Sequence, residues 1–145
     1  MILIIIKGLL FSTLLIYAAV TDIKRREIDN FVPVSILIVS LIGTGGSFLG
    51  TVVTALPFFI PALIKSGSIG GGDVKLMFSC GAVLGAWGGL TQTVFALALV
   101  AVFSLFILLA KGFKACKKTA IPLAPFLCAG GISVYIIKNM GGFVF

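Results

Sequence analysis

The sequence predicts an all-α integral membrane protein, with about six transmembrane helices in a single domain over residues 1–145. Hydrophobic residues make up 60% of the chain and charged residues only 10%, whereas a soluble domain carries about 25% charged residues. The mean hydropathy is correspondingly high, at +1.28. The apolar segments are continuous and lack the alternation of apolar and polar residues that a membrane β-barrel requires, so helices are favoured.

The expected spans are apolar segments separated by short polar or glycine-rich turns. They cover residues 1–20, 31–42, 48–64, 74–87, 90–110 and 120–137. We expect the first span to be a retained helix, because it lacks the basic leading segment and the clean small-residue cleavage site of a signal peptide. Pro57 and Pro61 are expected to kink the third span, which membrane helices tolerate when their neighbours satisfy the freed carbonyl groups.

Glycine and other small residues mark the expected turns and close contacts. The stretch 43–47 predicts a tight turn or a close-packing segment, and Gly88-Gly89 predicts the turn between the fourth and fifth spans. Small residues on the fourth span favour the close approach of a neighbouring helix. These are Gly81, Ala82, Gly85 and Ala86.

The net charge of +7 is spread over short loops, which is typical of topology signals and argues against a nucleic-acid partner. Nine basic residues follow spans one, three and five. They are Lys24, Arg25, Arg26, Lys65, Lys75, Lys111, Lys114, Lys117 and Lys118. Lys7 lies within the first span, and Lys138 alone lies on the opposite side. The positive-inside rule therefore predicts a multi-pass protein with those loops in the cytoplasm and both termini outside it.

The residue types available limit the chemistry. There is no histidine, and the three cysteines, Cys80, Cys116 and Cys128, form no C-x-x-C pair. A structural zinc site, a disulfide framework and histidine-based catalysis are therefore not expected, and we predict no cofactor and no metal. The cysteines are interpreted as small packing residues.

The acidic residues are the candidates for function. There are only four, and three of them, Asp22, Glu27 and Asp29, follow the first span, whereas Asp73 follows a run of three glycines at the mouth of the fourth. An acid at the edge of an apolar helix is costly and calls for a reason. The expected topology brings Asp22 and Asp73 to the same membrane face, although the sequence alone does not establish that they meet.

Two neighbouring carboxylates can hydrolyse a peptide bond, because like-charge repulsion makes them share one proton. The ionised member activates a water molecule and the protonated member polarises the carbonyl group. Adjacent glycines would let an extended substrate approach closely. The simpler interpretations are an interfacial anchor, a favourable charge at a helix N-terminus and a plain glycine turn. The residues by themselves leave a protease, a proton- or ion-coupled transporter and a scaffold open.

Three segments resemble the type IV prepilin peptidases, which are GxGD aspartyl membrane proteases. Residues 70–76 match the family pattern G-x-G-D-hydrophobic-K-L. Residues 22–30 resemble its loop of an aspartate, a basic run and an aliphatic residue before Pro-Asn, with Asp29 in place of the proline. Residues 121–127 are similar to its P-x-x-P-F-L segment. The order and spacing of the three segments also agree with the family.

The resemblance implies a GxGD protease-like bundle with Asp22 and Asp73 as the catalytic pair. It implies that Gly70 and Gly72 shape the substrate path, and Lys75 is a candidate for tuning Asp73 or holding substrate, beside its plainer role as a topology lysine. The implied partner is a prepilin, pseudopilin or archaellin-like precursor in the lipid bilayer of the cell membrane, cut at the cytoplasmic border. The chain has no counterpart of the N-terminal cytoplasmic domain with paired C-x-x-C motifs, which implies a short, peptidase-only form. The oligomeric state stays open.

Overall fold

The computed structural model describes residues 2–43, 46–64, 70–111, 121–139 and 141, and within these ranges all the regular structure is helical. The elements are α1 (Ile2–Arg25), α2 (Phe31–Ser40), α3 (Phe48–Ile64), α4 (Gly71–Lys111) and α6 (Ala124–Asn139). The prediction of an all-α protein is confirmed. Several predicted features fall outside the described residues, namely Lys65, Cys116 and the lysines at 114, 117 and 118.

Two helices, α1 and α4, contain a stretch that is long and apolar enough to cross a membrane. The helix α2 has 10 residues and is about 15 Å long, half of the roughly 30 Å hydrocarbon core. Large apolar side chains are exposed along α1, α3 and α4, which is typical of surfaces that face lipid rather than water. The count of six transmembrane helices stays a prediction.

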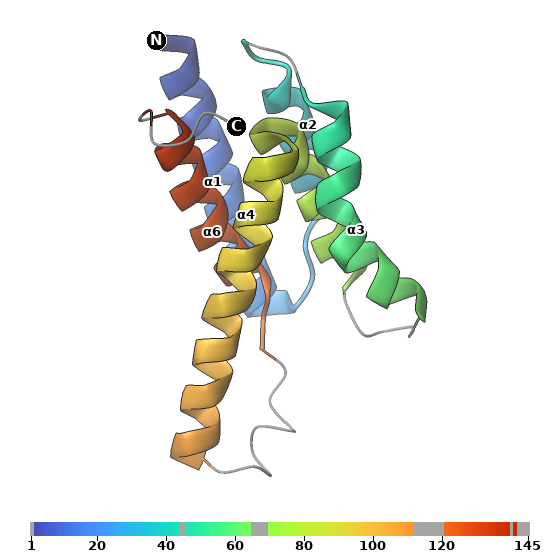
Figure 1. The fold of residues 1–145 in the computed structure, drawn as a ribbon, viewed down its shortest axis with the longest axis vertical. Helices are drawn as coiled ribbons and strands as arrows, with labels where there is room; N and C mark the ends of the chain where they lie inside the picture. The colour runs from blue at the N-terminus through green and yellow to red at the C-terminus, as the bar shows by residue number, and fades with distance from the viewer. Residues whose placement is uncertain (1, 44–45, 65–69, 112–120, 140, 142–145) are drawn as a thin grey trace.

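The helix α4 is two helical segments joined at Gly85, where the backbone leaves the helical conformation at φ +80° and ψ 177°. The chain reverses there, so residues 71–84 and 86–111 run in opposite directions (Figure 1). The predicted turn at Gly88-Gly89 is therefore wrong by a few residues. Glycine suits this turn because a positive φ strains every residue with a Cβ. Gly89 instead lies inside the helix, where a Cβ would collide with the side chain of Thr54.

The helices α3 and α4 approach each other at glycines. A Cβ on Gly50 would collide with the backbone of Gly81, and a Cβ on Gly81 would collide with the backbone of Gly50. The close packing predicted for Gly81 is thus confirmed, with a partner glycine that the sequence pattern did not identify. The core shared by the helices contains Phe11, Leu15, Ile36, Leu76, Met77 and Leu127, all fully buried.

Two lysines bind carbonyl groups at helix C-termini. Lys7, which is 7% exposed, donates from Nζ to the carbonyl oxygen of Ser40 at the end of α2, at 3.0 Å. Lys138 donates to the carbonyl oxygen of Leu84, just before the break in α4, at 2.8 Å. A cation at a helix C-terminus is favoured by the unsatisfied carbonyl groups there. The contact with Ser40 explains why Lys7 lies inside the apolar α1.

Candidate active site

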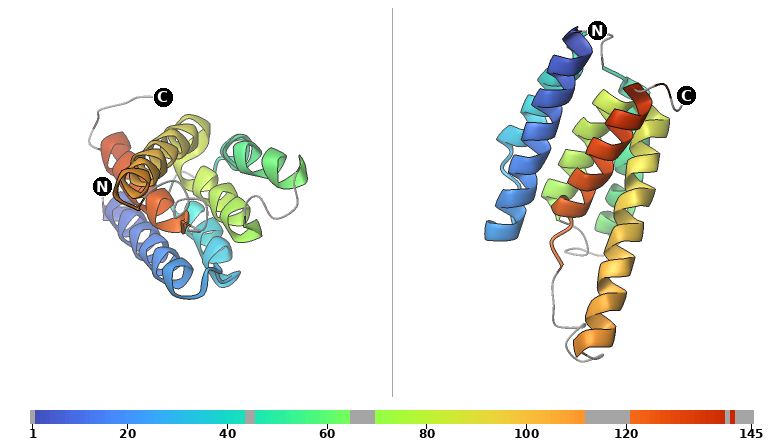
Figure 2. Two further views of the ribbon diagram at one scale, coloured as in Figure 1. Left: turned by 90° about the horizontal axis from the view of Figure 1, so that it is seen from below. Right: turned by 90° about the vertical axis from the view of Figure 1, so that its left-hand side faces the viewer.

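Four parts of the chain meet at the end of the bundle opposite to Lys7 and Lys138. They are the end of α1, the α1–α2 loop, the start of α4 and the start of α6 (Figures 1 and 2). A cavity of about 330 Å³ lies among the first three of these parts. Its lining residues are Asp22, Arg26, Glu27, Ile28, Asn30, Gly70, Gly71, Gly72 and Asp73. The cavity therefore joins both candidate aspartates with the glycines predicted to shape the substrate path.

Asp22 is held by α6. It lies near the C-terminus of α1 and is 8% exposed, and its Oδ2 accepts a hydrogen bond of 3.0 Å from the backbone N–H of Ala124. Ala124 is the first residue of α6, so this N–H has no acceptor within its own helix. The bond orients the carboxylate, and the N-terminus of α6 stabilises a negative charge on it.

The contact with Ala124 was missed by the sequence analysis. Pro122 and Pro125 lie where α6 begins, and proline is typical of the first turn of a helix. Nothing in the local pattern shows which distant side chain accepts the first N–H of that helix. The prolines thus mark the start of α6, but the residue that accepts its first N–H is set by how α1 and α6 pack.

The helical conformation ends just after Asp22, at Arg26. Arg26 has φ +55°, a left-handed conformation that is uncommon for a residue with a side chain. Its N–H donates to the carbonyl oxygen of Asp22 at 2.8 Å. Asp29 lies further along the α1–α2 loop, and its Oδ2 accepts a hydrogen bond of 3.2 Å from the hydroxyl of Tyr17 in α1. These bonds hold the α1–α2 loop against α1, with Asp29 directed to Tyr17 at the position where the resembling family has proline.

Asp73 lies in the first turn of α4, where its N–H donates to the carbonyl oxygen of Gly70 at 3.0 Å. Its Oδ1 is buried and has no hydrogen-bond partner among the described residues. Asp73 and Asp22 line the same cavity. A buried acceptor without a donor is unfavourable.

The G-x-G-D pattern has a steric explanation. A Cβ on Gly70 would lie 3.1 Å from Oδ2 of Asp73, and a Cβ on Gly72 would lie 3.0 Å from Cβ of Ile28 in the α1–α2 loop. A Cβ on Gly71 would meet no atom within 4 Å. The outer two glycines therefore keep space for the carboxylate and for the loop, whereas the middle position is open.

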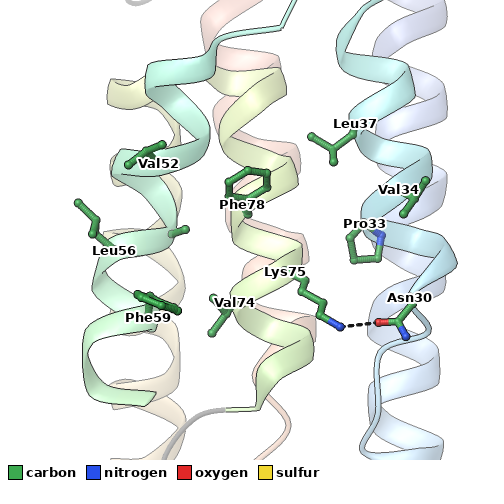
Figure 3. Close-up of a pocket in the computed structure, with 11 residues that line it drawn as sticks. Asn30, Pro33, Val34, Leu37, Val52, Leu56, Phe59, Val74, Lys75 and Phe78 are labelled. Carbon is green, nitrogen blue, oxygen red and sulfur yellow. Dashed lines mark hydrogen bonds between the residues drawn. The ribbon is translucent and has the colours of Figure 1, made fainter. Parts of the chain in front are cut away.

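Lys75 lies outside the lining of this cavity. Its Nζ donates to Oδ1 of Asn30 at 2.9 Å, which ties the first turns of α4 to the start of α2 (Figure 3). The geometry assigns Lys75 a positioning contact, while its predicted influence on Asp73 or on substrate stays a prediction.

In the part of the chain that the structure describes, no three histidine, cysteine, aspartate or glutamate side chains gather as metal ligands would.

Comparisons with known proteins agree with the resemblance seen in the motifs. Residues 9–110 match the model for the type IV leader peptidase family. The chain is also similar to the prepilin leader peptidase/N-methyltransferase of Bacillus subtilis (strain 168), with 31% identity over 137 residues, which cover 89% of this chain and 54% of that protein. It thus spans about half the length of this curated relative. No significant match to a solved structure was found.

Proposed function

This chain belongs to the type IV leader peptidase family, and from that premise we propose that it is a membrane aspartic endopeptidase. Its proposed substrates are type IV prepilin-like or archaellin-like precursors, from which it removes the leader peptide. The observation that carries the proposal is that Asp22 and Asp73, far apart in sequence, line one cavity. A transporter is not favoured, because the family is one of leader peptidases.

The two aspartates have different surroundings, which favours different roles. The N–H of Ala124 holds Oδ2 of Asp22 in place at the edge of the cavity, so Asp22 is proposed to be the base. Among the described residues, no donor reaches the buried Oδ1 of Asp73, and a protonated carboxyl group tolerates such surroundings better than an ionised one. Asp73 is therefore proposed to carry the proton that the pair shares.

The reaction follows from these roles. Asp22 takes a proton from a water molecule as the water oxygen bonds to the scissile carbonyl carbon, while Asp73 gives its proton to the carbonyl oxygen. The tetrahedral intermediate then breaks at its C–N bond. The leaving amine takes the proton held by Asp22, and Asp73 regains a proton from a hydroxyl group as the carbonyl reforms. Both carboxyl groups return to their starting states.

The proposed location is the cytoplasmic membrane, with several spans, the cavity at the cytoplasmic border and both termini outside. Two observations support it. The exposed surface of α1, α3 and α4 is apolar, and the cavity lies at the end of the bundle where Lys24 and Arg25 finish α1. Basic residues that flank a span are typical of the cytoplasmic side.

A cleavage assay tests the proposal. The purified protein in lipid vesicles is given a synthetic peptide with a short basic leader, a glycine and an apolar segment of about 20 residues. Mass spectrometry of the new N-terminus reports the cut. Asp22→Asn and Asp73→Asn are each expected to lower the rate on the order of 10³-fold or more.

The matched control is Asp29→Asn, which makes the same chemical change in the adjoining loop, outside the lining of the cavity. It should retain most of the parent rate. If either dyad variant folds and still cleaves at the parent rate, the assignment of the catalytic pair is wrong. Proton flux through the same vesicles in the absence of cleavage would instead favour a transporter.

A further inference from the structure

A second cavity, of about 700 Å³, separates two helices near the candidate active site. Within the described residues, α2 and α3 each pack against α4, but they do not pack against each other. The first segment of α4 therefore forms the floor of a groove, and α2 and α3 form its walls (Figure 3). We call this space the α2–α3 groove.

The groove is apolar over almost its whole lining. Each wall presents residues at helical spacing, so that a single face of each helix turns toward the gap. The residues are Pro33, Val34 and Leu37 on α2, Val52, Ala55, Leu56 and Phe59 on α3, and Val74 and Phe78 on α4. Val34, Val52 and Leu56 are exposed, so the groove opens sideways, toward the surface that we assign to lipid.

The polar end of the groove adjoins the cavity of the two aspartates. Asn30 lines both spaces, and its side chain accepts the hydrogen bond from Lys75 at the edge of the groove (Figure 3). Val74 and Lys75, which line the groove, directly follow Asp73 in the chain. A chain segment that leaves the groove at Asn30 therefore enters the space that contains the two carboxyl groups.

We propose that the α2–α3 groove binds the apolar helix of the precursor that this protein cleaves, with the start of that helix at Asn30 and Lys75. This inference rests on the proposed function and assigns a docking surface for its substrate. The helix lies along the groove and places its side chains between the two walls, a helix-in-groove mode of recognition. The leader then crosses the cavity of Asp22 and Asp73.

The position of the groove favours the substrate helix over lipid or a second copy of the chain. In a bilayer, an apolar groove has no hydrophobic preference for a helix over lipid tails, so the gain comes from side-chain packing. A precursor has a second point of attachment in its leader, which raises the effective concentration of its helix at the groove. A lipid chain or a second copy has no such attachment at the aspartates.

Site-specific photocross-linking tests the proposal. A photoreactive residue replaces Leu56 in the groove or, as a matched control, Leu10 on the outer face of α1. The two side chains are 43% and 42% exposed. Both proteins carry Asp73→Asn so that the synthetic prepilin-like peptide stays uncut, while the parent is assayed for cleavage in parallel. We expect a peptide adduct from position 56 and little from position 10.

The two readouts separate this inference from the proposed function. Cleavage by the parent without an adduct at position 56 overturns the groove and leaves the peptidase intact. An adduct at position 56 without cleavage supports the groove and counts against the peptidase. Adducts to lipid alone, adducts to a second copy of the chain, or equal yields from positions 56 and 10 overturn the groove.

Kinetics provide an independent readout. Val52→Trp narrows the groove, and Val102→Trp adds the same bulk to an exposed position on the second segment of α4, which does not line the groove. We expect Val52→Trp to raise KM roughly tenfold with kcat little changed, because it weakens binding without touching the reacting groups. Val102→Trp should leave both constants near those of the parent. A lowered kcat at unchanged KM for Val52→Trp contradicts the docking role.

Discussion

The glycines before Asp73 allow a test in which three neighbouring substitutions have different expected outcomes. Gly70→Ala, Gly71→Ala and Gly72→Ala each add one methyl group. At Gly71 the added Cβ meets no atom within 4 Å, and alanine is favoured over glycine in helices by up to about 1 kcal/mol. Gly71→Ala should therefore keep the parent's cleavage rate and be at least as stable to heat.

At Gly72 the added Cβ lies 3.0 Å from Cβ of Ile28, whereas carbon atoms prefer about 3.5–4.0 Å. Ile28 must move by several tenths of an ångström, and overpacking of this kind costs about 1–3 kcal/mol. The displaced loop carries residues that line the cavity, and a misplacement of about 1 Å can lower a rate by roughly 10²-fold. Gly72→Ala should lower both thermal stability and kcat/KM, the latter by roughly tenfold.

At Gly70 the added Cβ lies 3.1 Å from Oδ2 of Asp73, so the carboxylate itself must turn. Gly70→Ala should lower the cleavage rate more than it lowers stability, because a side-chain rotation relieves the contact. The assays are cleavage of the prepilin-like peptide in vesicles and thermal unfolding in detergent. A loss of activity in Gly71→Ala as large as that in Gly72→Ala, at unchanged stability, would refute the steric account of the pattern.

Two further predictions concern the surroundings of Asp22. Ala124→Pro removes the N–H that donates a hydrogen bond to Asp22, while proline is tolerated in the first turn of a helix. The cleavage rate should fall roughly tenfold or more, as expected for losing a hydrogen bond to a charged group. Ala124→Gly, which keeps the N–H, should cleave at nearly the parent rate, and equal losses would contradict the role of that bond. Arg26→Gly should unfold at a higher temperature than Arg26→Ala, because both remove the charge but only glycine relieves the positive φ. The expected difference in the free energy of unfolding is about 1 kcal/mol. Equal unfolding midpoints would show that no strain is stored at Arg26.

The helical character and the identity of the candidate residues could be predicted from the sequence. Continuous apolar segments and few charges predict helices in lipid, because an unpaired backbone polar group is too costly there. The rarity of acids limited the candidates to four residues, and the resemblance to the prepilin peptidases selected Asp22 and Asp73 from them. The structure places both in the lining of one cavity. These features depend on residue type and on neighbours along the chain, which the sequence displays directly.

The contacts between distant segments were decided by the tertiary structure alone. The chain turns at Gly85, which the local pattern indicated as a close-packing residue, rather than at Gly88-Gly89. Lys75 binds Asn30, and the first N–H of α6 binds Asp22. Each of these contacts requires two segments far apart in sequence to adopt one relative position. That position is set by side-chain packing over whole helices, which no local pattern encodes.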